Sequence, residues 1–296
     1  MKISAVVVSY NRLGLLRQTL GAIQQQSFQL HSVIVVDNGS TDGSREYLSD
    51  LDPAIFTICF MDSNVGGAGG FKHGIKVAYS QGADYIWCMD DDCLPELEAL
   101  QILVESEKSL CREYNIGFLA SRVEWADGEL AKMNLPVAHR DWSFPHKKHP
   151  NVSKIVGSSF VSLLISRHAV ELVGLPVAEF FIWFDDSEYT RRISDELDCF
   201  LISNSVVVHQ TATNPSPLDF DLLDDGALWK YKYGVRNEMS FFLYSRQYVF
   251  AFLYIAKLFF RVIKAGKIRY VPGIAAAVIK GLLFNYRKYI EYPSAK

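Results

Sequence analysis

The sequence has few cysteines and no long apolar run, and each shortage excludes a class of protein. Its five cysteines form no Cys-x-x-Cys pair, and none has a histidine partner at zinc-site spacing. Both facts argue against a disulfide framework and a structural zinc site. Because no stretch reaches about 18 uninterrupted apolar residues, no membrane-spanning helix is predicted. The apolar run in MKISAVVVSYNR is too short for a signal peptide and lacks a small-residue cleavage site, so we expect a cytoplasmic protein.

Acidic residues are scarce in the C-terminal part of the chain. Residues 246–296 contain ten Lys and Arg and a single acid, Glu291, which gives a charge of +9. The first 245 residues carry twenty Lys and Arg and thirty-two Asp and Glu, or −12, so the net charge is −3. A basic tail on an acidic body predicts different partners for the two regions. The acidic body also argues against nucleic acid as a partner, because it would repel phosphate.

The N-terminal part of the sequence alternates strand and helix patterns. Residues 3–8 and 32–37 are continuous Val- and Ile-rich runs, typical of strands buried on both faces of a parallel sheet. Leucines between them recur at helical spacing. The alternation continues with helices near 43–50 and 69–81 and strands near 55–60 and 84–89. This order predicts a mostly parallel α/β sheet with its ligand beyond the carboxyl ends of the strands.

Beyond residue 115 the pattern is less regular. Strands are expected at 116–121, 155–165, 198–202 and 205–208, and a helix at 187–196. From about 222 to 290 the chain is helical and aromatic in pattern, and Pro272-Gly273 is the expected break.

Three consecutive aspartates, Asp90–Asp92, directly follow the apolar strand 85–89. Clustered carboxylates repel one another, and a divalent cation such as Mn²⁺ or Mg²⁺, which prefers oxygen ligands, removes that repulsion. The alternative is a solvated turn that caps the helix near Pro95. Polar loops after the earlier strands favour the metal site; they are Ser9–Arg12, Asp37–Ser40 and Asp62–Gly70. His209, which ends the strand 205–208, is either a packed side chain or a further ligand.

Two further motifs precede predicted helices. Residues 66–70, GGAGG, suit a phosphate cradle, a close-approach loop or an ordinary turn. They match neither the dinucleotide nor the P-loop glycine pattern, which argues against a nicotinamide dehydrogenase and a P-loop NTPase. The pair Asp185–Asp186 suits a general base, because adjacent like charges raise one pKa. The same pair also suits a helix cap with a first-turn acid.

The motifs SYNR, VVDNGSTDGS, NVGGAGGF, DDD and FDDSEYTRRI, in this order, resemble glycosyltransferase family 2 with the GT-A fold. The resemblance covers roughly residues 1–245. NVGGAGGF and WFDDSEY are similar, more narrowly, to bacterial galactofuranosyltransferases, and rhamnosyltransferases share most of the other motifs. The resemblance implies an α/β fold with a Rossmann-like nucleotide-binding sheet. Its nucleotide-binding half would be about 1–115 and its acceptor half about 116–221, followed by a basic helical extension, 222–296.

The resemblance also implies a reaction. We expect an inverting, metal-dependent transfer of galactofuranose from UDP-galactofuranose to a glycan or lipid-linked acceptor in cell-surface polysaccharide synthesis. The alternatives are a rhamnosyltransferase that uses dTDP-rhamnose and a non-catalytic subunit that binds sugar nucleotides. Galactofuran polymerases are larger, with extra domains at both ends, so we expect the addition of one or a few sugars.

Carried over residue by residue, the resemblance implies a role for each motif. Asp186, with Asp185 as second choice, would be the base, and Asp90, Asp92 and His209 would hold Mn²⁺ or Mg²⁺. The implied nucleotide contacts are Ser9, Asn11, Arg12, Asp37, Asn64, Gly69, Gly70, Asp90 and Asp91. The implied acceptor side consists of Trp183, Gly157, Ser158 and Ser159. A structural or acceptor-side role is expected for Tyr231, Tyr233, Arg236 and Asn237, which resemble a Tyr/Arg-Asn segment of the family.

The basic tail favours a membrane surface. Residues 246–290 combine nine Lys and Arg with many aromatic residues and no acid, as in amphipathic segments that dock on anionic lipid. The alternative is a helical hairpin that packs on the body with its charges in solvent. Because lipid-linked acceptors are common in the family, we expect peripheral association with the cytoplasmic face of the inner membrane.

Overall fold

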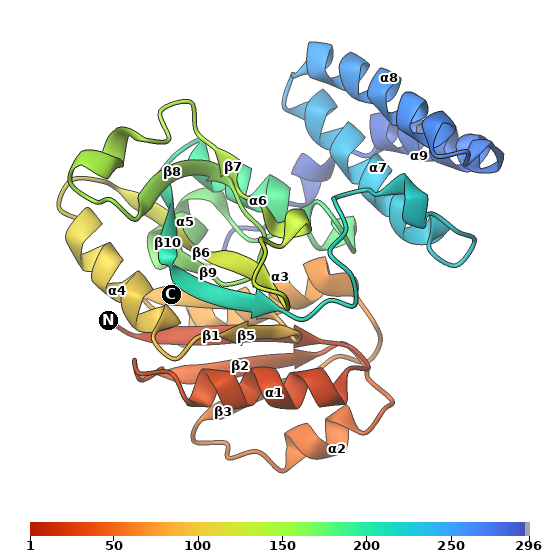
Figure 1. Cartoon of the computed structure of the whole chain (residues 1–296). Helices are drawn as coiled ribbons and strands as arrows, with labels where there is room; N and C mark the ends of the chain where they lie inside the picture. The colour runs from red at the N-terminus through yellow and green to blue at the C-terminus, as the bar shows by residue number, and fades with distance from the viewer. Residues whose placement is uncertain (294–296) are drawn as a thin grey trace.

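The computed structural model describes residues 1–293 and is built around one ten-stranded mixed sheet (Figure 1). The strand order is β3-β2-β1-β4-β9-β6-β10-β8-β7, and β5 pairs with β10. The strands are β1 (Ile3–Ser9), β2 (Ser32–Asp37), β3 (Phe56–Phe60), β4 (Tyr85–Asp90), β5 (Cys93–Pro95), β6 (Ile116–Trp125), β7 (Val137–Ala138), β8 (Val152–Gly157), β9 (Leu163–Ser166) and β10 (Asp198–His209).

Helices cover both faces of the sheet. They are α1 (Leu13–Gln24), α2 (Ser44–Ser49), α3 (Gly66–Ser80), α4 (Ala99–Leu110), α5 (Arg167–Val173), α6 (Asp185–Ser194), α7 (Leu228–Tyr244), α8 (Tyr248–Lys264) and α9 (Val271–Leu283). Apolar side chains of α1 and α4 pack against one face, and those of α3, α5 and α6 pack against the other. Each face therefore has its own apolar cluster.

The first four strands are parallel, as the sequence predicts. Val7 of β1 lies in register with Val35 of β2 and Met89 of β4, and all three are buried. Strands buried on both faces tolerate only apolar side chains, which explains the unbroken Val and Ile runs. Because the strands are parallel, their carboxyl ends and the polar loops that follow meet at one edge of the sheet.

The second half of the sheet differs from the prediction in two places. Residues 155–165 do not form one strand: β8 ends at Gly157, and β9 begins at Leu163 in another position of the sheet, antiparallel to β4 and β6. Ser162, at φ +54°, turns the backbone between them. The strands predicted at 198–202 and 205–208 are a single strand, β10, with a register shift between Ile202 and Val206.

Helices α7, α8 and α9 share a third apolar cluster and lie together at one corner of the molecule, away from β1–β3 (Figure 1). Pro272 does not break a helix. It lies in the first turn of α9, where its missing N–H costs nothing. The helical pattern is instead interrupted at 265–270. Within residues 1–293, no helix has both the length and the apolar character needed to span a membrane.

Candidate active site

The acidic residues that follow β4 meet His209 at the end of β10. Ligand atoms of Asp90, Asp92, Cys93 and His209 all lie within 4.8 Å of one another. The pairing of β5 with β10 sets His209 directly opposite Cys93, and His209 Nε2 lies 3.0 Å from Asp92 Oδ1. Sheet pairing thus brings together residues that are 117 positions apart in the chain.

The charges of this cluster are strongly coupled. Burial and repulsion by Asp92 raise the pKa of Asp90 to about 7. Burial opposes both shifts, but the hydrogen bond and the charge attraction between Asp92 and His209, with the charge of Arg12, together lower the pKa of Asp92. The same hydrogen bond and the nearby carboxylates raise the pKa of His209 despite its burial. Burial raises the pKa of the Cys93 thiol well above its usual range, and hard divalent cations prefer oxygen to sulfur, so Cys93 is the least suited of the four to hold Mn²⁺ or Mg²⁺. Two carboxylates and an imidazole remain, a donor set that fits Mn²⁺ or Mg²⁺.

Asp91 ties the end of β4 to the end of β1 and the loop that follows it. It accepts hydrogen bonds from the Ser9 hydroxyl (2.8 Å) and the Tyr10 N–H (3.4 Å). The guanidinium of Arg12 reaches both Asp91 Oδ1 (3.3 Å) and Asp92 Oδ2 (2.6 Å). The middle aspartate of the three therefore holds the loop in place, while its neighbours face the cavity.

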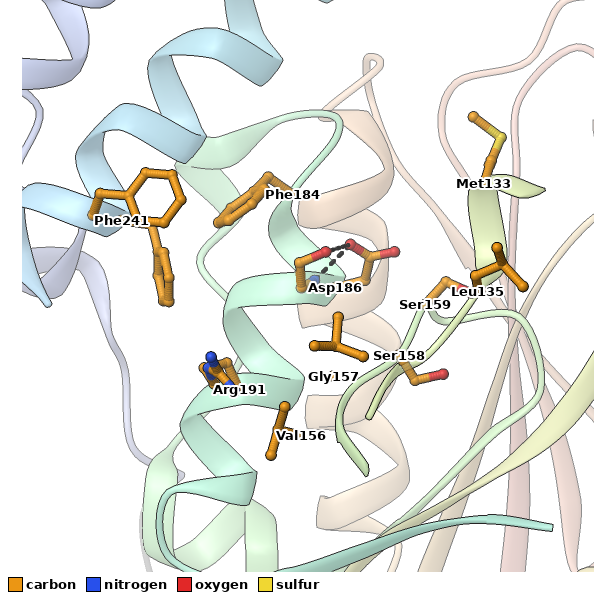
Figure 2. A pocket seen from close by; sticks show the side chains of 13 residues that line it. Met133, Leu135, Val156, Gly157, Ser158, Ser159, Phe184, Asp186, Arg191 and Phe241 are labelled. Carbon is orange, nitrogen blue, oxygen red and sulfur yellow. Dashed lines mark hydrogen bonds between the residues drawn. The ribbon is translucent and has the colours of Figure 1, made fainter. Parts of the chain in front are cut away.

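A cavity of about 570 Å³ connects this cluster with the start of α6. Asp90, Asp92 and His209 line it, as do Asp185 and Asp186. A smaller cavity of about 250 Å³ adjoins it, and Asp186 and Ser159 line both. Figure 2 shows Asp186 between Phe184 and Phe241 on one side and Ser158 and Ser159 on the other. Asp186 therefore lies where the two cavities meet.

Asp185 and Asp186 are the first two residues of α6. Burial raises the pKa of both carboxyl groups, and in Asp185 repulsion by Asp186 adds to it. Asp186 accepts hydrogen bonds from the N–H (2.6 Å) and the hydroxyl (3.1 Å) of Ser187 (Figure 2). Neither aspartate is the N-cap, which is Phe184. A carboxylate with a raised pKa that faces a cavity is suited to accept a proton.

The predicted acceptor residues line these cavities. Trp183 lines the larger cavity, Gly157 and Ser158 line the smaller one, and Ser159 lines both. Trp183 packs edge-on against Tyr231, with ring centroids 5.2 Å apart.

Several predicted nucleotide contacts organise loops and do not line either cavity. Asp37 is fully buried, where it accepts from the Ser40 N–H and pairs with Arg45 (3.4 Å). Asn11 Oδ1 accepts from the Thr41 N–H (2.7 Å), which joins two polar loops. Asn64 Oδ1 accepts from the Gly66 N–H (2.8 Å) at the start of α3.

The glycine run is not a loop ahead of a helix. Helix α3 already begins at Gly66, three residues before the predicted start. A Cβ atom at Gly70 would lie 2.5 Å from Val8 Cγ1, and one at Gly69 would lie 2.7 Å from Val65 Cγ2. Gly69 and Gly70 therefore allow close packing of α3, the second of the three roles left open, and Gly67 is the glycine that lines the larger cavity.

Two residues that sequence reasoning missed also line the larger cavity, Asn134 and Glu238. Asn134 Oδ1 lies 2.8 Å from His209 Nδ1, and its amide nitrogen donates to the Ser159 hydroxyl (2.9 Å). This contact favours a proton on Nδ1 and leaves Nε2 free to face the acidic cluster. Neither residue lies in a recognisable motif, so no signal in the sequence marks them.

Comparisons with known proteins relate the N-terminal part of the chain to one family. Residues 4–134 match the family model described as glycosyl transferase family 2. Over 93 residues the chain is 40% identical to galactofuranosyltransferase GlfT1 of Mycolicibacterium smegmatis, covering 31% of this chain and 30% of the relative. Over 106 residues it is 35% identical to the O-antigen chain rhamnosyltransferase RfbN of Salmonella typhimurium, covering 35% of this chain and 32% of the relative. The matched segments span less than a third of the length of each relative.

The fold is shared more widely than the sequence. The crystal structure of GalNAc-T7 with UDP, GalNAc and Mn²⁺ superposes with a TM-score of 0.57 at 14% identity, and the match covers 83% of this chain and 50% of that chain. At this level of identity the likeness concerns the fold alone. It confirms the α/β fold of GT-A type, with a helical C-terminal region, that the sequence predicts.

Proposed function

We propose that this protein, whose residues 4–134 match the model of glycosyl transferase family 2, moves a sugar from a nucleotide donor to an acceptor hydroxyl inside the larger cavity. One observation carries the proposal. An acidic cluster with a histidine and a separate carboxylate, that of the partly exposed Asp186, face the same cavity. These are the two groups that such a displacement needs, one at the leaving diphosphate and one at the attacking oxygen.

The donor end of the cavity would hold the diphosphate. Asp90, Asp92 and His209 would bind Mn²⁺ or Mg²⁺, which supplies positive charge against the developing diphosphate anion. Asn134 orients His209 so that Nε2 faces this site. The half-exposed guanidinium of Arg12, which forms an ion pair with Asp92, would also bind phosphate oxygens.

Asp186 would remove the proton of the acceptor hydroxyl as its oxygen bonds to the anomeric carbon and the bond from that carbon to the diphosphate breaks. Attack from the side opposite the leaving group inverts the anomeric centre. Asp186 lies where the two cavities meet, so the acceptor can approach through the smaller one while the donor occupies the larger one. Asp185 borders only the larger cavity, which makes it the second choice.

For the donor we propose UDP-galactofuranose. The 40% identical relative is a galactofuranosyltransferase, and the neighbour of similar fold contains UDP. A rhamnosyltransferase is the second candidate, because the segment that matches RfbN is similarly long.

A donor screen tests both the enzyme and its substrate. Purified protein with Mn²⁺ is incubated with UDP-galactofuranose, UDP-glucose or dTDP-rhamnose and a glycan acceptor, and released nucleoside diphosphate is measured. Release from UDP-galactofuranose alone is expected, and release from dTDP-rhamnose alone would favour the second candidate. If no donor is turned over but UDP and Mn²⁺ still stabilise the protein, the chain is a non-catalytic binding subunit.

We also propose that α8 rests on an anionic membrane surface at the cytoplasmic face of the inner membrane. Its inner side packs on α7 and α9 through Ala251, Leu258 and Val262, as expected for a helical hairpin. Its outer side exposes large apolar residues beside two basic ones; they are Tyr248, Val249, Phe250, Phe252, Leu253, Lys257, Phe260, Ile263 and Lys264. Apolar residues flanked by Lys, on a helix that itself contains no acid, suit anionic lipid.

Flotation with liposomes tests this surface. The double variant Phe252→Ser/Phe260→Ser should float less than wild type with vesicles that contain anionic lipid. The control is Leu172→Ser, which removes an exposed apolar side chain from α5, away from the surface. Equal flotation of wild type and the double variant would contradict the assignment.

A further inference from the structure

The loop that leads into Asp185 and Asp186 has an unusual backbone. Phe181, Trp183 and Phe184 have positive φ angles of 65°, 62° and 74°. Bulky side chains disfavour this region, so the loop keeps its shape only if neighbouring groups hold it. Because Phe184 is the N-cap of α6, the conformation of the loop sets the position of Asp185 and Asp186 at the start of that helix.

Asn237 of α7 supplies the main restraint on this loop. Its side chain is fully buried. Its amide nitrogen donates to three carbonyl oxygens of the loop, those of Phe180 (3.0 Å), Ile182 (3.1 Å) and Trp183 (2.8 Å). Three acceptors share two hydrogens, so the loop carbonyls converge on one amide group.

Arg236 fixes the direction of that amide. Its Nε and Nη2 donate to Asn237 Oδ1, at 2.9 Å and 2.7 Å. Because Oδ1 is engaged in this way, the amide nitrogen must face the loop. The same guanidinium donates to the carbonyl of Glu179 (2.6 Å) and lies over the rings of Tyr233 and Phe284.

The opposite side of the loop touches the donor half of the protein. The Ala68 N–H, in the first turn of α3, donates to the carbonyl of Phe181 (3.2 Å). A Cβ atom at Gly66 would lie 2.0 Å from that carbonyl oxygen, so only glycine fits there. The loop is therefore held between α3 and α7, and Ile182 and Trp183 line the larger cavity.

We propose that Asn237 is a positioning residue: through the carbonyls of the loop 180–184 it sets Asp186 toward the reacting hydroxyl, and Arg236 keeps its amide in the required orientation. This inference rests on the proposed function. It makes α7, which belongs to the C-terminal helical region, a part of the catalytic geometry. Asp90, Asp92 and His209 are held at the edge of the sheet by strand pairing, so we expect UDP binding to survive a change at Asn237.

Asn237→Asp tests this with almost no change in volume. The substituted carboxylate cannot donate hydrogen bonds and would repel the three carbonyl oxygens that the amide nitrogen now holds. The loop should therefore change its conformation. The value of kcat should fall about 100-fold, as expected when a reacting group is misplaced by about an ångström. The Kd for UDP with Mn²⁺ should stay close to the wild-type value. Arg236→Lys, which keeps the charge but loses the planar fork, should give a smaller loss in the same direction.

Ser240→Ala is the matched control. Ser240 is buried on the same helix, but its hydroxyl donates to the carbonyl of Phe284 rather than to a carbonyl of the loop 180–184. Its kcat should stay near the wild-type value. If Asn237→Asp loses no more kcat than Ser240→Ala, or loses UDP binding in proportion to kcat, the positioning role is wrong.

Hydrogen exchange separates this inference from the proposed function. Amides of residues 181–188 should exchange faster in Asn237→Asp and in Asn237→Ala than in wild type, while those of 85–92 stay unchanged. If the wild-type protein turns over no donor but the exchange differs in this way, the proposed function fails and the loop restraint stands. Unchanged exchange at 181–188 in both variants would overturn the restraint itself.

Discussion

The two ends of the larger cavity are built in different ways. The donor end consists of side chains at strand ends, where regular parallel pairing sets their positions. The base end is a loop with three unfavourable φ angles, held by side chains of a distant helix. Strand ends are rigid because every backbone group of the ladder is paired, whereas the loop depends on a few contacts. The two ends should therefore fail separately when they are mutated.

The largest effect is expected at the base end. Asp186→Asn should lower kcat about 10³-fold, because the amide cannot accept the hydroxyl proton. Binding of UDP with Mn²⁺ should remain, since the donor end is untouched. Asp195→Asn, an exposed acid at the other end of α6, is the control. Steady-state kinetics and calorimetric titration with UDP measure both quantities, and loss of UDP binding in Asp186→Asn would show that the two ends are not independent.

A substitution in the acidic cluster tests the donor end by itself. Asp92→Asn should abolish the thermal stabilisation by Mn²⁺, which for a ligand at about 100 times its Kd amounts to about 2.7 kcal/mol. Cys93→Ala should keep the stabilisation, because Mn²⁺ prefers oxygen to sulfur ligands. A thermal-shift titration with Mn²⁺ measures this, and a full response in Asp92→Asn would remove the aspartate from the cation site.

Asn134 contacts both His209, at the donor end, and Ser159, on the acceptor side, so its loss should affect both ends of the cavity. Asn134→Ala should weaken Mn²⁺ binding about tenfold, as is usual when the partner of a metal-binding histidine is lost. It should also raise the KM for the acceptor, because the loop after β8 loses a hydrogen bond. If Asn134→Ala weakens Mn²⁺ binding but leaves the KM for the acceptor unchanged, Asn134 does not link the two ends of the cavity.

The smallest effect concerns stability at the α7 wall of the cavity. Burial raises the pKa of Glu238 to about 7. The folded protein therefore binds this proton more tightly than the unfolded chain, so its contribution to stability is present at low pH and is lost as the pH rises through about 7. Glu238→Gln should flatten the fall of Tm between pH 5 and 8 by a few degrees. If Tm changes with pH equally in Glu238→Gln and wild type, the Glu238 carboxyl group is solvated and its pKa is not raised.

Local sequence patterns were sufficient for the donor end. Val and Ile runs predict β1 and β2, and the continued alternation of apolar strand and helix patterns predicts β3 and β4. Acids after a buried strand predict a cluster at the sheet edge. All of these signals rest on residues close together in the chain. The glycine run was predicted as a loop because its close packing against Val8 cannot be recognised from the sequence. Residues 155–165 were predicted as one strand because β8 and β9 are both apolar, and their separate partners in the sheet lie far away.

By itself, then, the sequence determined the parallel half of the sheet, the three aspartates at its edge and the helical basic tail, because short-range periodicity and burial dictate these features. Only the tertiary structure decided that Asn134 turns His209 toward Asp92 and that Asn237 holds the loop ahead of Asp186. Such contacts join side chains that are brought together when strands and helices pack. Hydrogen bonds between distant residues leave no periodic trace along the chain, so no local pattern encodes them.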